Sequence, residues 1–247
     1  MVDAVRTMQS DVGPVKQSIY ELSSTQLHRL GMRATTGDGR AFRYSEAGGV
    51  ALTPGKLIQG AAPLANHLNR AAAATAAVGA TKVQVGFGAT AAAANYYVEG
   101  FLHCNDNGAE GEIYKVKSHL AISGSDDVWI NLYDPLVTAI TITTDEVTLT
   151  KNPWDSTIIV PNTGYTAGVV GVPIIDVTAS SYFWAQTWGP CPVLTQGAVV
   201  IGQNVILGGT ADGAIGPSTV DVSPNIGWVM QVNASTEYSL IFLTICP

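Results

Sequence analysis

Charged side chains are scarce in this sequence. Only 13% of the 247 residues are Asp, Glu, Lys or Arg, and 47% are hydrophobic, whereas about 25% of the residues in soluble domains are charged. Much of the surface must therefore consist of uncharged polar and small residues, which tolerate being covered by neighbouring proteins. No charge occurs between Asp176 and Asp212, but glycines and prolines interrupt this region. We therefore predict no membrane-spanning helix and no membrane partner.

Cysteine is also rare. Cys104, Cys191 and Cys246 are far apart and odd in number, which argues against a disulfide framework and against a cysteine-based metal site. The first residues, MVDAVRTMQS, contain no apolar stretch of the kind found in secretory signals. We therefore expect reduced, buried cysteines in a chain that stays in the cytoplasm where it is made.

Recognised motifs for catalysis or cofactor binding are missing as well. There is no Gly-x-Ser-x-Gly or His-Glu-x-x-His, and in GVALTPGK the glycine spacing and Leu57 both depart from a phosphate loop. His103 and His119 could meet across a predicted hairpin. With Cys104 or Asp106 they could hold a metal ion, and the acidic turns DNGAEGE and SGSDD could hold calcium. Ordinary surface residues explain these patterns better, so we predict neither an enzyme nor a cofactor.

The positive charges are concentrated near the start of the chain. Residues 1–70 hold eight of the twelve Lys and Arg beside five acidic residues, whereas the rest holds four Lys and fourteen acidic residues. Without a Lys run or interleaved aromatic residues, this excess does not indicate nucleic-acid binding. YELSSTQLHRLGMR predicts one short helix that ends at Gly31, and extended pieces follow it. We predict that residues 1–70 form an extended basic arm, which becomes ordered against an acidic partner.

Beyond residue 70 the sequence alternates short apolar runs with turn signals, as mainly β proteins do. TKVQVGFGA should point Val83, Val85 and Phe87 inward, and the Asn-Asp-Asn-Gly stretch at 105–108 should turn a hairpin. The last run, EYSLIFLTI, is apolar on both faces and should be a central strand. We predict a mainly β fold with little helix. Two small β-sandwich or β-barrel units, residues 71–155 and 156–247, should follow the arm.

The stretch SSYFWAQTWGPCPVL, residues 180–194, is rich in aromatic residues. As a strand it would place Trp184, Gln186 and Trp188 on one face, where tryptophans could stack on a sugar ring. Its setting in an uncharged β region favours a central strand instead. We expect Trp184 in the core, with Trp188 covering its open end before Pro190 releases the chain.

Several ordered motifs run along nearly the whole chain: YELSSTQLHRLGMRATTGDGRAFRY, EGFLHCNDNGAEGEIYKVKSH, VTLTKNPW, YFWAQTWGPCPVL and GWVMQVNASTEYSLIFLTI. Together they resemble structural proteins encoded near the head genes of tailed bacteriophages. The resemblance implies a head decoration (cement) protein without catalytic residues, located on the outer surface of the virion head. It also implies two partners, the major capsid protein and further copies of the chain, as a homodimer or homotrimer at capsid symmetry axes.

An arm would suit this role because an extended segment can cover a large surface while ordering only on assembly. We expect the arm to dock on the capsid through Arg29, Arg33, Asp38, Arg40, Phe42, Arg43 and Tyr44. The alternative function is a tail-fibre or spike-like adhesin. It would bind host surface glycan through exposed Trp154, Trp184 or Trp188.

Overall fold

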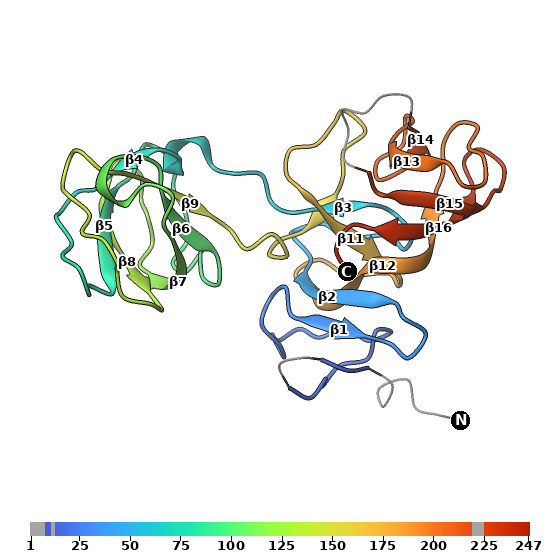
Figure 1. The fold of residues 1–247 in the computed structure, drawn as a ribbon, viewed down its shortest axis with the longest axis horizontal. Helices are drawn as coiled ribbons and strands as arrows, with labels where there is room; N and C mark the ends of the chain where they lie inside the picture. The colour runs from blue at the N-terminus through green and yellow to red at the C-terminus, as the bar shows by residue number, and fades with distance from the viewer. Residues whose placement is uncertain (1–7, 11–12, 219–224) are drawn as a thin grey trace. The chain divides into compact units, whose positions relative to one another are not determined.

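The computed structural model describes residues 8–10, 13–218 and 225–247, and the regular structure in these residues is almost entirely β-strand. The strands form two antiparallel sheets in two compact units (Figure 1), one made of Met1–Ala61 with Pro153–Pro247 and the other of Ala62–Asn152. The predicted mainly β fold with two barrel-like units is confirmed. No helix in the described part of the chain is long and apolar enough to cross a membrane.

The unit Ala62–Asn152 is a curled, barrel-like sheet of six strands, which we call the small barrel. Its strands are β4 (Arg70–Ala71), β5 (Lys82–Gly86), β6 (Phe101–Cys104), β7 (Ile113–His119), β8 (Asp127–Leu132) and β9 (Glu146–Thr150). They are paired in the order β4-β9-β6-β7-β8-β5, and an antiparallel bridge between Ala72 and Val85 joins the two end strands. Two 3-10 turns, Ala65–His67 and Asn107–Ala109, accompany the strands.

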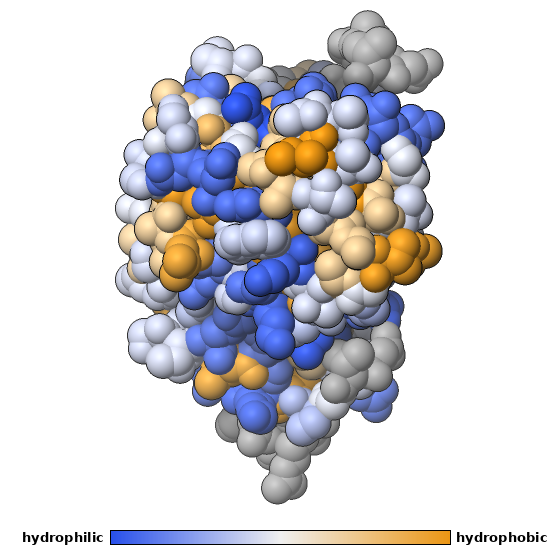
Figure 2. All heavy atoms as spheres, turned by 90° about the vertical axis from the view of Figure 1, so that its left-hand side faces the viewer, coloured by the Kyte–Doolittle hydropathy of each residue, from blue (hydrophilic) through white to orange (hydrophobic). Residues whose placement is uncertain are grey.

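Two expectations for the small barrel are confirmed. Val83, Val85 and Phe87 are buried in its interior, and β6 and β7 form a hairpin whose connection contains the predicted turn at 105–108. Alternate residues of β5 and β8 are buried, as in a barrel whose alternate residues point inward. On the face drawn in Figure 2, hydrophobic side chains occur as small groups between hydrophilic ones.

The discontinuous unit, Met1–Ala61 with Pro153–Pro247, contains a ten-stranded sheet. Its strands are β1 (Arg33–Thr35), β2 (Ala41–Glu46), β3 (Ile58–Gln59), β10 (Ile158–Ile159), β11 (Val169–Pro173), β12 (Tyr182–Leu194), β13 (Asn204–Leu207), β14 (Ile215–Pro217), β15 (Gly227–Gln231) and β16 (Tyr238–Thr244). The main order is β10-β3-β11-β12-β16-β15-β13-β14, and β2 pairs with both β1 and β12. The last strand, β16, lies between β12 and β15 and is central as predicted.

The prediction of an extended arm over residues 1–70 is wrong for the described residues of that segment. The hairpin of β1 and β2 pairs with β12, and β3 lies between β10 and β11. Phe42, Tyr44 and Ile58 are fully buried. The predicted boundaries at 70 and 155 are therefore replaced by a small barrel inserted, in sequence, into one larger unit. Residues 1–7 and 11–12 of the predicted arm lie outside the described residues.

The short helix predicted for YELSSTQLHRLGMR is also wrong, because no helix forms there. Ser23, within this segment, makes two backbone hydrogen bonds to a distant strand instead. The N–H of Ser23 donates to the carbonyl of Tyr182 at 3.0 Å, and the N–H of Tyr182 donates to the carbonyl of Ser23 at 2.8 Å. These tertiary bonds satisfy backbone groups that a helix would have used internally.

Strand β12 organises the discontinuous unit. Its first half pairs with β2 and its second half with β16. Phe183 and Trp184 point to opposite faces, and each is buried in a separate hydrophobic cluster. Trp184 is only 1% exposed, which confirms the core prediction.

The expectation that Pro190 releases the chain is wrong. Gly189, with φ of 88°, lies between the two halves of β12, and the strand continues to Leu194. A left-handed φ of this kind is readily adopted only by glycine. Pro190 then stands opposite Phe242 of β16 in the register of the sheet.

Candidate functional site

The residues predicted to form a capsid interface do not make one exposed surface. Phe42 and Tyr44 have no exposed area. The hydroxyl of Tyr44 donates to Oε1 of Gln17 at 2.9 Å and accepts the N–H of Leu27 at 3.2 Å. These two aromatic side chains stabilise the core, so the prediction of an interface role is wrong for them.

Two of the predicted arginines, Arg33 and Arg43, belong to the hairpin of β1 and β2, where they lie opposite each other. The guanidinium of Arg43 donates to the carbonyl of Gly31 at 3.1 Å and to Sγ of Cys246 at 3.0 Å, and it lies 5.5 Å from the centre of the Trp154 ring. Arg43 therefore connects the hairpin to the last residues of the chain. These contacts give its guanidinium a role in the fold, so a capsid partner is not needed to explain an arginine at this position.

The other predicted charges lie nearer the surface. Arg40 forms an ion pair of 2.8 Å with Asp38 at the tip of the same hairpin. Hydrogen bonds, first from the hydroxyl of Thr36 and then from Arg40, lower the pKa of Asp38. The charges of Arg40 and Asp38 therefore compensate each other. Of the four predicted arginines, Arg29 alone is exposed.

The possible metal site at His103 and His119 does not form. His119 is buried in the small barrel, where its Nε2 accepts the backbone N–H of Tyr97 at 3.0 Å and its Nδ1 bonds the carbonyl of Leu120 at 2.7 Å. His103 lies opposite Ile113 on another strand. Within the described ranges, no three His, Cys, Asp or Glu side chains are grouped so that they could hold a metal ion.

One face of the sheet formed by β12, β16 and β15 carries no charge. Residues of these strands alternate between a buried side, with Cys191, Ile241 and Leu243, and a partly exposed side. We call the partly exposed side the apolar face. Its apolar side chains are Trp188, Pro190, Pro192, Trp228, Leu240 and Phe242, and the uncharged Gln231, Tyr238 and Thr244 lie on the same side of the sheet.

Three aromatic rings cross the apolar face from strand to strand. Trp228 lies opposite Phe242 in the register, and their rings are stacked with centroids 5.2 Å apart. The ring of Trp188 meets Phe242 edge-on at 5.5 Å. Cross-strand pairs of this kind fix the side chains that they join. The face is therefore ordered before any partner binds, while Trp228 keeps 37% of its surface exposed.

The tryptophans proposed for glycan binding are mostly occupied by packing. Trp184 is buried, and Trp154 donates its indole N–H to the carbonyl of Val170 at 3.3 Å and packs against Gly31. Trp188 alone belongs to the apolar face. Gln186, the expected polar partner of a sugar, is 1% exposed.

The side-chain amide of Gln186 forms hydrogen bonds within β12 and is not available to a ligand. Its NH₂ group donates to the carbonyls of Trp188, Gly189 and Pro190, at 3.1, 3.3 and 2.9 Å. These bonds hold the middle of β12, where the strand passes from one pairing partner to the next. The sequence contained a signal for the apolar face that the prediction missed: GWVMQV and EYSLIFLTI both alternate large apolar residues on the two sides of a strand.

Comparison of the chain with models of protein families, with curated proteins and with solved structures finds no match in any of the three. Among the surfaces described above, the apolar face has the composition that best fits a protein partner.

Proposed function

We propose that this chain is a structural protein of a tailed-bacteriophage virion, which decorates the outer surface of the head and stabilises it by binding the major capsid protein. The observation that carries the proposal is the apolar face, an uncharged and ordered aromatic surface. Aromatic residues are enriched, and charged residues depleted, at the centre of protein–protein interfaces. The class of partner comes from the motif resemblance, which also implies dimers or trimers at the capsid symmetry axes.

The position of the face suits a contact that must resist force. β16 lies between β12 and β15 in the sheet, so the residues that β16 contributes to the apolar face have a neighbouring strand on both sides. A surface that is ordered in advance loses little conformational entropy on binding. Contacts of modest area are sufficient when many copies bind one shell, because engagement at several points raises the overall affinity.

In this proposal the folded unit makes the contact, and an arm does not. β2 pairs with β12, and it places two fully buried aromatic residues in the core around Trp184. Removing residues 1–50 would therefore destabilise the whole discontinuous unit, and such a truncation would not test capsid binding. Single substitutions at exposed positions test it better.

Cosedimentation of the purified chain with empty heads of the same phage tests the proposal. Trp228→Asp and Pro192→Asp each place a charge at an exposed position of the apolar face, whereas Tyr20→Asp and Val50→Asp do so at exposed apolar positions elsewhere in the unit. We expect saturable binding of the wild type and of the two control variants. Binding of the face variants should be at least about tenfold weaker, because a charge in an interface centre must be desolvated without a partner.

The melting temperature of each variant shows whether it is folded. A folded Trp228→Asp or Pro192→Asp chain that binds heads as well as the wild type would contradict the assignment of the face. A wild-type chain that does not bind heads at all would contradict the proposed function itself.

A further inference from the structure

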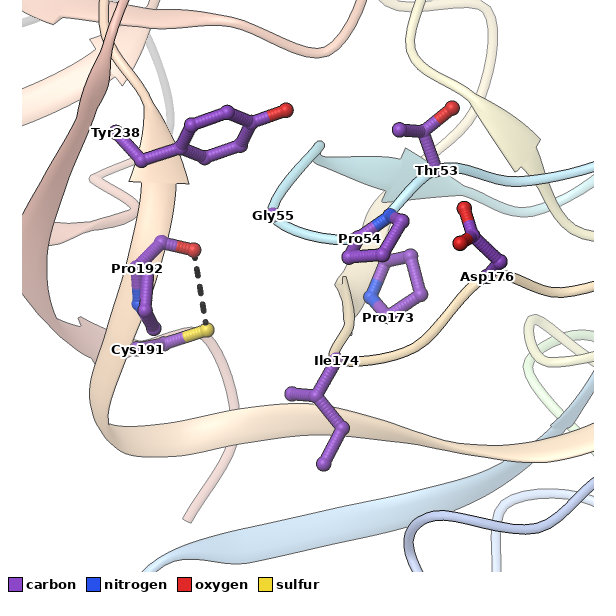
Figure 3. A pocket seen from close by; sticks show the side chains of 9 residues that line it. All are labelled: Thr53, Pro54, Gly55, Pro173, Ile174, Asp176, Cys191, Pro192 and Tyr238. Carbon is purple, nitrogen blue, oxygen red and sulfur yellow. Dashed lines mark hydrogen bonds between the residues drawn. The ribbon is translucent and has the colours of Figure 1, made fainter.

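A pocket of about 350 Å³ opens in the discontinuous unit, beside the apolar face (Figure 3). Two of its lining residues belong to that side of the sheet, Pro192 on β12 and Tyr238 at the start of β16. The residues that line it come from the segment before β3, from β11 and the residues that follow it, and from β12 and β16: Thr53, Pro54, Gly55, Pro173, Ile174, Asp176, Cys191, Pro192 and Tyr238. A volume of this size lies within the range of small-ligand sites.

The lower wall of the pocket is apolar. In Figure 3, Pro173, Ile174 and Cys191 face the open space below Pro54. The thiol of Cys191 points toward the carbonyl of Pro192, at 3.6 Å, and burial raises its pKa to about 12. At neutral pH it is therefore an uncharged thiol, which adds to the apolar surface.

The pocket is built into the sheet. The N–H of Gly55 donates to the carbonyl of Pro173 at 2.9 Å, and the carbonyl of Gly55 accepts the N–H of Leu194 at 2.8 Å. The turn is thereby fixed to both β11 and β12. Gly55 has φ of 71°, and a Cβ there would lie 2.5 Å from Cε1 of Tyr238. Only glycine lets the Tyr238 ring pack on this turn, so the walls are in place without a ligand.

The rim of the pocket is polar. In Figure 3 the hydroxyl of Thr53 and the carboxylate of Asp176 lie on the right of the view, and the hydroxyl of Tyr238 lies at the upper left. None of these three groups has a hydrogen-bond or ion-pair partner among the described residues. Asp176 is also the one Asp, Glu, Lys, Arg or His in the lining. The pocket thus combines an apolar wall with an unpaired negative charge at its mouth.

We propose that this pocket binds a basic side chain, lysine or arginine, presented by a partner protein. The aliphatic stem of such a side chain would cover Pro54, Pro173 and Ile174 while its cationic head reaches Asp176, because long basic side chains bury the stem and keep the charge at a polar surface. The rigid prolines lose little freedom when the stem binds. An anionic or fully apolar group would leave the carboxylate unpaired, so the charge selects a cation.

This inference does not rest on the proposed function, because a basic side chain of any partner protein would fit. The two are tested separately. The apolar face is probed with heads, where Trp228→Asp changes a residue outside the pocket lining, and the pocket is probed with a small cation.

Benzamidine is a suitable probe, since it joins a flat apolar ring to an amidinium cation, and benzamide is its neutral counterpart. Titration of either compound into the isotopically labelled full chain, followed by NMR, reports binding at Ile174 and Tyr238. We expect saturable shifts at these residues with benzamidine and affinity up to about fivefold weaker for benzamide, because an exposed charged pair contributes at most about 1 kcal/mol.

Asp176→Asn should lower the affinity for benzamidine by a similar factor and leave that for benzamide unchanged. The matched control is Asp134→Asn, which alters an exposed aspartate without a partner among the described residues, in the small barrel. This variant should bind like the wild type. Shifts outside the pocket only, equal binding of the two compounds, or full affinity in Asp176→Asn would each overturn the proposal.

Discussion

Replacing Trp184 by Ala should strongly destabilise the discontinuous unit. The side chain is 1% exposed, its ring lies 5.1 Å from Tyr44 and 5.4 Å from His28, and its indole N–H donates to the carbonyl of Gln17 at 3.0 Å. Removing a buried tryptophan side chain costs about 3–5 kcal/mol. Leaving the Gln17 carbonyl without its donor adds about 1 kcal/mol.

The loss converts into a measurable shift in melting temperature. For a domain of about 150 residues, each kcal/mol lowers Tm by about 2–4 °C, so a loss of about 4–6 kcal/mol in Trp184→Ala should lower Tm by roughly 10–20 °C. Calorimetry of the full chain measures this shift, and hydrogen exchange of peptides from β2 and from β7 shows which unit has lost stability. Trp228→Ala, at a 37% exposed position, is the control with a much smaller expected effect.

A shift below about 3 °C would refute the assignment of Trp184 to a tightly packed core, since removing an indole from such a core costs several kcal/mol of stability. Equal shifts in Trp184→Ala and Trp228→Ala would refute it too. Faster exchange confined to β7 would show that the wrong unit had been affected.

Three further outcomes are expected. Burial lowers the pKa of His119, so the unfolded chain takes up the proton at a higher pH than the folded chain. The small barrel should therefore lose stability as the pH falls below the ordinary value of 6.5. Thermal melts at pH 7.5 and 5 should show a smaller loss in His119→Gln than in the wild type. Gly227→Ala would place a Cβ 2.1 Å from the carbonyl oxygen of Phe242, so urea unfolding should show a loss of about 2 kcal/mol or more, against almost none for Gly37→Ala in open space. In the native chain, iodoacetamide should alkylate Cys246 before the two buried cysteines, whose pKa values burial raises to about 11 and about 12; peptide mass spectrometry measures the order.

Local pattern was sufficient to predict the β character of the small barrel and the two long strands of the larger sheet, β12 and β16. Val83, Val85 and Phe87 alternate with polar or small residues within one strand and its end, and the turn at 105–108 lies between two adjacent strands. Such features depend on neighbours in the sequence. The burial of Trp184 was also predictable, because its surroundings contained no charge to hold it at a surface.

The discontinuous unit could not be predicted in the same way. β2 and β3 pair with strands more than a hundred residues later, and no local periodicity records such a partner. Short strands between glycines and prolines look like an arm when their partners are unknown. Arg43 and Gln186 illustrate the same limit for the candidate site, since each looked available for binding and each is used by the fold.

Copy number in purified particles of the phage that we propose encodes this chain tests the central claim most directly. A decoration protein of the head should be present in hundreds of copies per particle, in proportion to the major capsid protein, since it repeats with the capsid lattice. A quantitative stained gel, with the capsid protein as internal standard, measures this ratio. Hundreds of copies would support head decoration. A chain absent from the particles, or present in tens at most as expected for a tail adhesin, would contradict it.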